Sequence, residues 1–187
     1  MGLTKLGIEI EKSFIEVNEK MQTSVPGIYA IGDVTGKLLL AHVAQAQGIL
    51  AVEIIAGMES PALDYKKMPR ATYCQPQVAS FGYTEKEAVD IGYSVKVGRF
   101  PFRANGKSLA LGETEGLVKL VTDGDSGAIL GTHMIGTEVT GMMSAVAMTS
   151  LLEGTVKELG WLVHSHPTLS EAAKEAALAV DDLAIHI

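Results

Sequence analysis

A polar turn of five residues between two apolar runs is the feature that most constrains the fold of this chain. Residues 123–127 read Asp-Gly-Asp-Ser-Gly, and they separate two runs rich in residues with high β propensity, at 116–122 and 128–135. These residue types favour a tight hairpin turn, and strands joined by so short a connection pair antiparallel. Two further strands are predicted at 78–81 and 94–102, so this part of the chain should form an antiparallel sheet.

Helices are predicted among and after these strands. Thr84 and Glu87 have the spacing of a capping box, which indicates the start of a short helix. A helix over 138–152 is apolar on most of its surface, so its own sheet or another subunit must bury it. A last helix should begin near Thr168 and run through 171–183. Hairpin strands combined with two or three helices predict an α+β fold, an antiparallel sheet flanked by helices.

The beginning of the chain follows a different pattern. A buried strand is predicted over 28–33, followed by a Gly-containing loop and a helix over 41–56. A strand, a Gly-containing turn and a helix make half of a βαβ unit, which predicts a partial α/β piece. A linker rich in Pro and polar residues follows at 57–70. We therefore expect two domains, 1–62 and 67–187.

Composition restricts the class of partner and the compartment. The net charge is −7, from 22 acidic and 15 basic residues, and the only basic cluster is Lys66-Lys67 with Arg70. We therefore expect neither nucleic acid nor a membrane as a partner. The single cysteine, Cys74, allows no intrachain disulfide and no Cys-based zinc site. The most apolar stretch, 141–152, is shorter than the ~20 residues of a membrane span. A cytoplasmic protein is expected.

Side chains with acid/base potential gather in the segment from His164 to Glu171. Histidine has the unperturbed pKa nearest to neutrality and is the usual general acid/base, and a neighbouring carboxylate would fix its tautomer. Pro167 is favourable in the first turn of a helix. A helix beginning there would put Glu171 about one turn after His166, close enough to reach back to it.

Three other interpretations of this segment remain open. Thr168 and Glu171 have the spacing of a capping box, which would make Glu171 purely structural. His164 and His166 could instead bind a metal together with Glu171. The two histidines could also lie on the surface without a role.

Two motifs resemble those of a known family. His166-Pro167-Thr168, followed by Glu171, resembles the C-terminal signature of the pyridine nucleotide-disulfide oxidoreductases. The fuller segment 164–171 is similar to that of the dihydrolipoamide dehydrogenases within this family. Residues 23–34 resemble the second flavin motif of the same family. The resemblance covers essentially the whole chain, and it implies a dimerisation domain preceded by part of an FAD-binding domain.

The resemblance also implies a cofactor site. In this family the aspartate of the second flavin motif hydrogen-bonds the ribityl chain of FAD. The backbone of the following helix start approaches the isoalloxazine ring, where free amides and the helix dipole suit electron-rich atoms. The implied cofactor-binding residues are Asp33, Leu39, Leu40, Ala41 and His42.

By the same resemblance, His166 would take a proton from a thiol of dihydrolipoamide, and Glu171 would orient His166. The thiolate would then attack a redox disulfide in the partner subunit. FAD and NAD are the implied cofactors of the full enzyme. A homodimer through 67–187 is implied, with a lipoyl-bearing protein as the substrate.

The sequence departs from the family pattern in several places. Gln47-Gly48 stands where the family commonly has Glu-Gly, which argues against a role for a charge at that position but not against the family resemblance. No G-x-G-x-x-G motif and no pair of cysteines at C-x-x-x-x-C spacing occurs. We therefore expect a fragment that is inactive alone and does not itself bind FAD or NAD. The alternative is a stand-alone dimerisation or interaction module without redox activity.

Overall fold

The structure is a computed structural model that describes residues 2–187. The chain divides into two compact units, the first ending at Tyr65 and the second beginning at Lys66. Each unit contains its own cluster of buried apolar side chains. Among the described residues, none of the helices combines the length and the apolar character that a membrane span requires.

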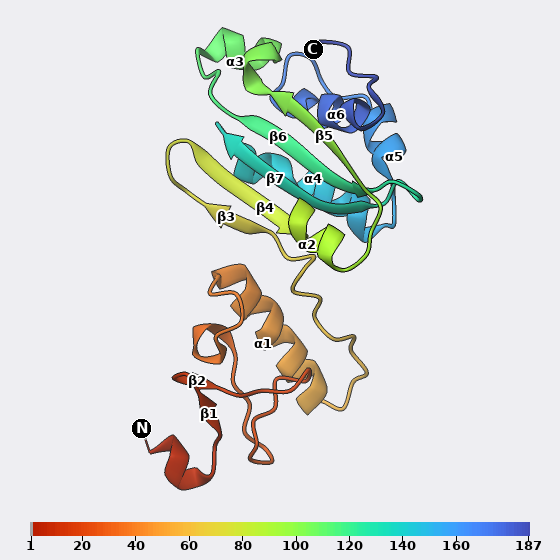
Figure 1. Ribbon diagram of the computed structural model, residues 1–187. Helices are drawn as coiled ribbons and strands as arrows, with labels where there is room; N and C mark the ends of the chain where they lie inside the picture. The colour runs from red at the N-terminus through yellow and green to blue at the C-terminus, as the bar shows by residue number, and fades with distance from the viewer. Residues whose placement is uncertain (1) are drawn as a thin grey trace. The chain divides into compact units, whose positions relative to one another are not determined.

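The first unit is organised around the helix α1, Ala41–Ile55, which is close to the helix predicted from the sequence (Figure 1). Leu50 and Ala51 of α1 pack with Met21 in a small apolar core. The other elements of this unit are short: η1 Leu3–Leu6, β1 Ile10–Glu11, β2 Phe14–Ile15 and η2 Gly32–Thr35.

The prediction of a strand over 28–33 is wrong. Only Tyr29 of this run forms a β-bridge, with Gln22, and the 3-10 helix η2 begins at Gly32. Ile31 is extended, but the described residues offer this run no strand with which it could form a ladder. An apolar run with β propensity therefore gives extended backbone here without a sheet, because a strand requires a neighbour.

The second unit is built on a five-stranded antiparallel sheet in the order β3-β4-β7-β6-β5 (Figure 1). The predicted hairpin is confirmed, since β6 and β7 pair on either side of the turn at 123–127. The strands are β3 Arg70–Thr72, β4 Gln77–Gly82, β5 Val95–Pro101, β6 Leu117–Asp123 and β7 Ile129–Gly136. β3 begins inside the region predicted to be a linker.

Helices cover one face of this sheet. Alternate strand residues such as Phe81, Phe100, Val118 and Met134 are buried there together with residues of α4, α5 and α6. These helices span Val139–Leu151, Val156–Trp161 and Glu171–Leu178. The remaining elements are α2 Glu85–Asp90, η3 Phe102–Ala104, α3 Gly106–Leu111 and η4 Ala179–Asp181. The arrangement confirms the α+β prediction.

The helix α6 packs directly against β5, and Gly98 permits this approach. A Cβ atom at Gly98 would overlap the backbone carbonyl oxygen of Ala176 and the side chain of Val180. The absence of a side chain at this position therefore sets where α6 lies on the sheet. Because α6 carries Glu171 at its first position, Gly98 helps to place that carboxylate.

Several helix predictions require correction. The capped helix at Thr84 and the apolar helix α4 are confirmed, but the second unit also contains α3 and α5, which makes more than the two or three helices predicted. The last helix begins at Glu171 and not near Thr168, because the Thr168 amide is bonded to the Glu171 side chain in a turn. It ends at Leu178 and is followed by η4, short of the predicted residue 183.

Candidate functional site

The proposed catalytic histidine lies in the irregular segment between α5 and α6. His166 precedes Pro167 in this segment, and Glu171 opens α6. The side chain of His166 is 76% exposed, whereas that of Glu171 is 25% exposed. The structure thus brings the two predicted residues together, with the ring accessible and the carboxylate largely covered.

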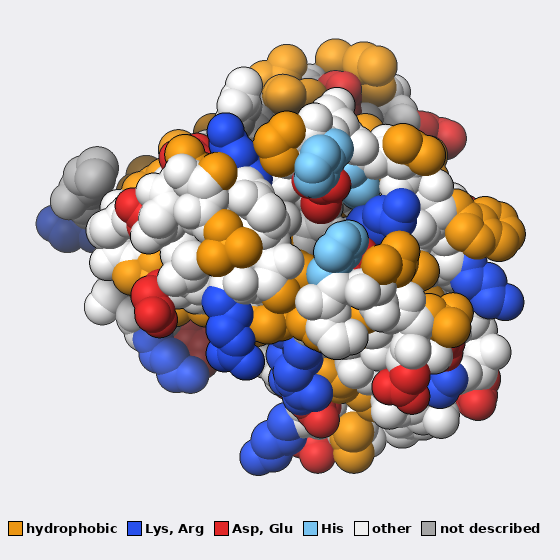
Figure 2. All heavy atoms as spheres, turned by 90° about the horizontal axis from the view of Figure 1, so that it is seen from above, with side chains coloured by type: hydrophobic (Ala, Val, Ile, Leu, Met, Phe, Trp, Pro, Cys, Tyr) orange, Lys and Arg blue, Asp and Glu red, His pale blue; other side chains and the backbone are white. Residues whose placement is uncertain are grey.

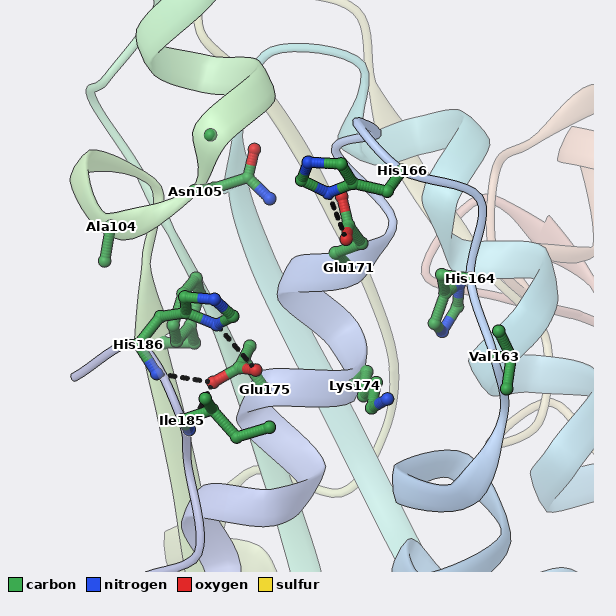
Figure 3. A pocket seen from close by; sticks show the side chains of 12 residues that line it. Ala104, Asn105, Val163, His164, His166, Glu171, Lys174, Glu175, Ile185 and His186 are labelled. Atoms are coloured by element: carbon green, nitrogen blue, oxygen red, sulfur yellow. Dashed lines mark hydrogen bonds and ion pairs between the residues drawn. The ribbon is translucent and has the colours of Figure 1, made fainter.

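The two oxygens of the Glu171 carboxylate have different partners. Oε1 lies 2.9 Å from Nδ1 of His166, and Oε2 accepts a 2.8 Å hydrogen bond from the Thr168 amide. The Thr168 hydroxyl donates to the Ser165 carbonyl, so the reciprocal half of a capping box is absent. The same carboxylate therefore both holds the turn and contacts His166, so Glu171 does more than cap the helix (Figure 3).

The electrostatics of Glu171 keep it ionised. Burial raises the pKa of this carboxyl, but hydrogen bonds from the Thr168 amide and His166 outweigh burial, and the net pKa lies below its ordinary value. An ionised carboxylate only accepts hydrogen bonds, so Nδ1 of His166 must carry the proton that it donates. In the neutral ring Nε2 is then the bare, basic nitrogen, as a general base requires.

His164 does not join this pair. Its Nε2 is buried without a hydrogen-bond partner among residues 2–187. Burial lowers the pKa of His164, and the nearby Lys174 lowers it further. Across the part of the chain that the structure describes, no group of three or more His, Cys, Asp or Glu side chains is placed to hold a metal, so the geometry gives no support to a metal site at His164, His166 and Glu171.

A cavity of about 130 Å³ adjoins His166 and Glu171, and several residues that line it were not singled out from the sequence. Asn105 is buried, caps α3 through the Ser108 amide and donates from Nδ2 to the Thr168 carbonyl. It thus fastens the turn that carries His166. The helix α3 was not predicted from the sequence, so nothing there pointed to Asn105 as a capping residue. Lys174, Glu175 and His186 also line the cavity. Figure 2 shows pale-blue histidine side chains beside red acidic ones on one face of the molecule.

In the first unit, the five predicted cofactor-binding residues cluster around the start of α1. Asp33 lies in η2, Leu40 is the N-cap of α1, and α1 begins at Ala41. Four of the five are exposed, namely Asp33, Leu39, Ala41 and His42, and Leu40 is half-buried. An exposed carboxylate next to the N-terminus of a 15-residue helix fits the ribityl hydroxyls and the electron-rich ring of a flavin.

Gln47, which stands where the family commonly has a glutamate, has a structural role. It is completely buried, accepts a 2.6 Å hydrogen bond from the Gly32 amide and donates to the Tyr65 hydroxyl at 3.0 Å. The neutral amide thus ties α1 to the start of η2, next to Asp33. A neutral side chain suits this position because burying a charge without an opposite charge is costly.

Comparison with protein families identifies both units. The family "pyridine nucleotide-disulphide oxidoreductase, dimerisation domain" matches residues 68–177, and "pyridine nucleotide-disulphide oxidoreductase" matches residues 1–48. The chain belongs to the pyridine nucleotide-disulphide oxidoreductase family. The antiparallel sheet with its covering helices is therefore the dimerisation domain of this family.

Curated relatives are similar along nearly the whole chain. The chain is 50% identical to a dihydrolipoyl dehydrogenase of Bacillus subtilis over 186 residues, which are 100% of this chain and 39% of the relative. It is 52% identical to a dihydrolipoyl dehydrogenase of Mycobacterium leprae over 176 residues, 93% of this chain and 38% of the relative. The chain thus spans about two fifths of the length of these relatives.

Solved structures show the same architecture. LpdA from Mycobacterium tuberculosis superposes with a TM-score of 0.86 at 25% identity and covers 94% of this chain and 39% of its own. The HOCl-induced flavoprotein disulfide reductase RclA from Escherichia coli, in a Cu(II) complex, has a TM-score of 0.86 at 22% identity over 94% of this chain and 40% of its own. At that identity the second likeness concerns the fold alone.

Proposed function

We propose that the chain is the C-terminal part of a dihydrolipoamide dehydrogenase, an enzyme that oxidises dihydrolipoamide with FAD and NAD. The observation that carries this proposal is the exposed His166, whose Nδ1 is held by Glu171 and whose Nε2 is left bare. The relatives named as dihydrolipoyl dehydrogenases at 48–52% identity support the choice of substrate. The chain supplies this acid/base pair and the dimer interface, and is inactive alone.

In this proposal the reaction begins with a proton transfer. The S–H bond of one substrate thiol breaks, and Nε2 of His166 takes the proton. The resulting thiolate attacks one sulfur of a redox disulfide in the partner subunit, which forms a mixed disulfide and releases the other sulfur as a thiolate. Glu171 holds the ring in the tautomer that can accept the proton and stabilises the protonated ring, as the third member of a catalytic triad does.

The first unit, about 1–62, would contribute part of the FAD site. Asp33 would bind the ribityl chain, and the backbone from Leu39 to His42 would face the flavin ring at the start of α1. The bound FAD would supply the redox chemistry that links the dithiol to NAD. The remaining contacts to FAD, and those to NAD, would come from outside this chain, because no phosphate-binding glycine motif occurs in it.

The second unit, about 67–187, would form a homodimer, as the name of its domain family indicates. Large exposed apolar side chains of this unit support this, since Leu152 and Trp161 are each 73% exposed and Val163 is 86% exposed. Large apolar side chains that form an exposed patch mark protein interfaces. A lipoyl-bearing protein would be the physiological substrate, and we propose a cytoplasmic location.

A chimaeric enzyme tests this function. The chain would replace the matching part of the Bacillus subtilis relative, and the oxidation of dihydrolipoamide by NAD would be measured. We expect activity from the chimaera and a loss of about 10²–10⁴-fold with His166→Gln, the range that a positioned acid/base contributes. His133→Gln, which changes a histidine on the sheet bonded to the Tyr83 carbonyl, is the control. A folded flavoprotein chimaera that turns over equally well without His166 would contradict the proposal.

A further inference from the structure

A second histidine–carboxylate pair lies one turn further along α6. Glu175 is 4% exposed, and its Oε1 lies 3.0 Å from Nδ1 of His186. Its Oε2 accepts hydrogen bonds from the amides of Ile185 and His186, at 2.8 and 3.2 Å. The chain end that carries His186 is thus fastened to the helix by a buried carboxylate.

This arrangement repeats that of the first pair. In both, one carboxylate oxygen from α6 holds Nδ1 of a histidine, and the other oxygen holds backbone amides of the segment that carries the histidine. Figure 3 shows both rings along one side of α6, each joined by a dashed line to a carboxylate of that helix. If Nδ1 of His186 donates to Glu175, its Nε2 is a bare acceptor, like that of His166.

Both rings line the same cavity. His186 is accessible, with its side chain 63% exposed, and no hydrogen bond to its Nε2 forms within residues 2–187. The cavity walls include apolar carbon from Phe100, Ala104, Val163 and Ile185. The other titratable groups that face it are His164, Lys174 and the two carboxylates. The carboxylates are already engaged, and Nε2 of His164 is fully buried. The accessible acceptors are therefore Nε2 of His166 and Nε2 of His186.

Two bare acceptors in a cavity with apolar walls match a small molecule that carries two donors on a short carbon chain. We propose that His186 is a second substrate-contacting residue, whose Nε2 accepts a hydrogen bond from the second thiol of a bound dithiol while the first thiol faces His166. This inference rests on the proposed function and extends it, because it makes His186 and Glu175 part of the selection of dithiols over monothiols.

The test is a titration of the chain with dihydrolipoamide under reducing conditions, followed by NMR of the histidine ring resonances. We expect the resonances of His166 and His186 to shift together. His186→Phe keeps the backbone amides bonded to Glu175 and should weaken binding about 2- to 10-fold, the worth of one hydrogen bond. A monothiol with the same carbon chain should bind the wild type and His186→Phe equally well.

Glu175→Gln provides a second variant with its own signature. The glutamine amide can donate to Nδ1 of His186, which would move the ring proton to Nε2 and remove the acceptor. The ¹⁵N shifts of the ring should report the tautomer change, and dithiol binding should weaken as in His186→Phe.

A shift of His166 alone, or equal dithiol binding by the wild type and His186→Phe, would overturn the inference and leave the proposed function intact. Dithiol binding that shifts neither histidine would overturn it as well. Turnover of the chimaera tests the proposed function separately, so the two failures can be told apart.

Discussion

At the scale of single residues, the site depends on how one carboxylate divides its oxygens. Glu171 uses one oxygen for the Thr168 amide and the other for His166, and the short distances of 2.8 and 2.9 Å show that both bonds are formed. The turn therefore holds the carboxylate in place, and the carboxylate in turn holds the ring. In the proposed function the same residue would have both a structural and a chemical role, which the sequence alone presented as alternatives.

Glu171→Gln tests this division of roles. The carbonyl oxygen of a glutamine can accept one of the two hydrogen bonds. Its amide nitrogen can only donate, so it cannot replace the second carboxylate oxygen. We expect turnover of the chimaera to fall, by at most the ~10²–10⁴-fold that a positioned acid/base contributes, while the fold is kept. NMR of His166 should show loss of the Nδ1–H tautomer. Unchanged turnover together with a changed tautomer would show that the orientation of His166 is irrelevant to catalysis.

The sequence could predict some of these residues and not others. His166 and Glu171 are five positions apart, so local spacing was enough to pair them. Glu175 and His186 are eleven positions apart and meet only because the chain folds back after η4, and Asn105 reaches Thr168 from 63 positions away. Such contacts depend on tertiary structure, which periodicity and motifs do not encode.

At the scale of elements, the close approach of α6 to β5 places the Glu171 carboxylate. Gly98→Ala would push a methyl group into the Ala176 carbonyl, and neither backbone can move far inside a packed layer. We expect a loss of about 1–3 kcal/mol in the free energy of unfolding, as for other overpacked sites. Urea unfolding measures it. Gly106→Ala is the matched control, because a Cβ there meets no atom within 4 Å; equal stability of the two variants would contradict the argument.

The capped start of α2 makes stability depend on pH. A hydrogen bond from the Thr84 amide, with others from Lys66 and the Thr84 hydroxyl, lowers the pKa of Glu87 to about 2 from its ordinary value of 4.5. A lowered pKa in the folded state stabilises the fold above pH 4.5, and this contribution disappears as the pH falls toward 2.

Glu87→Gln should therefore be less stable than the wild type at neutral pH, and the difference should shrink as the pH falls through this range. Thermal unfolding between pH 7 and acid measures this. Glu113→Gln, at an exposed carboxylate, is the control and should follow the wild-type curve. A stability difference for Glu87→Gln that is independent of pH would rule out an ionic origin.

The elements themselves were predictable where local signals agreed. The hairpin β6–β7, the capped helix α2 and the apolar helix α4 each had a turn, a cap or a continuous apolar run. The strand at 28–33 failed because β propensity does not supply a pairing partner. The helix α5 was missed although Thr155 and Glu158 form a capping box, since the helix has only six residues and little periodicity.

At the scale of the whole molecule, the chain should associate through its second unit. On α4, Leu151 is 61% exposed, next to further exposed apolar residues. We expect a dimer at micromolar concentration in size-exclusion chromatography with light scattering. Leu151→Glu should shift the chain toward the monomer, whereas Leu6→Glu, at an equally exposed leucine (61%) in the first unit, should not. A wild-type monomer under these conditions would contradict the proposed homodimer.

Dimerisation alone does not separate an enzyme part from a stand-alone interaction module, since both would associate. What separates them is whether His166 of one subunit deprotonates a substrate thiol that then attacks the disulfide of the other subunit. The accessible ring and its held tautomer are consistent with such a role, and a pure interaction module would have no need of them.

The most direct measurement of this claim is subunit complementation in the chimaera. One copy would carry His166→Gln and the other would lack the redox disulfide, so that each homodimer is inactive. Mixed dimers contain one intact site, built from the disulfide of the first copy and the histidine of the second. The account predicts that mixed dimers regain dihydrolipoamide oxidation. Mixed dimers that form but remain as inactive as the two homodimers would contradict it.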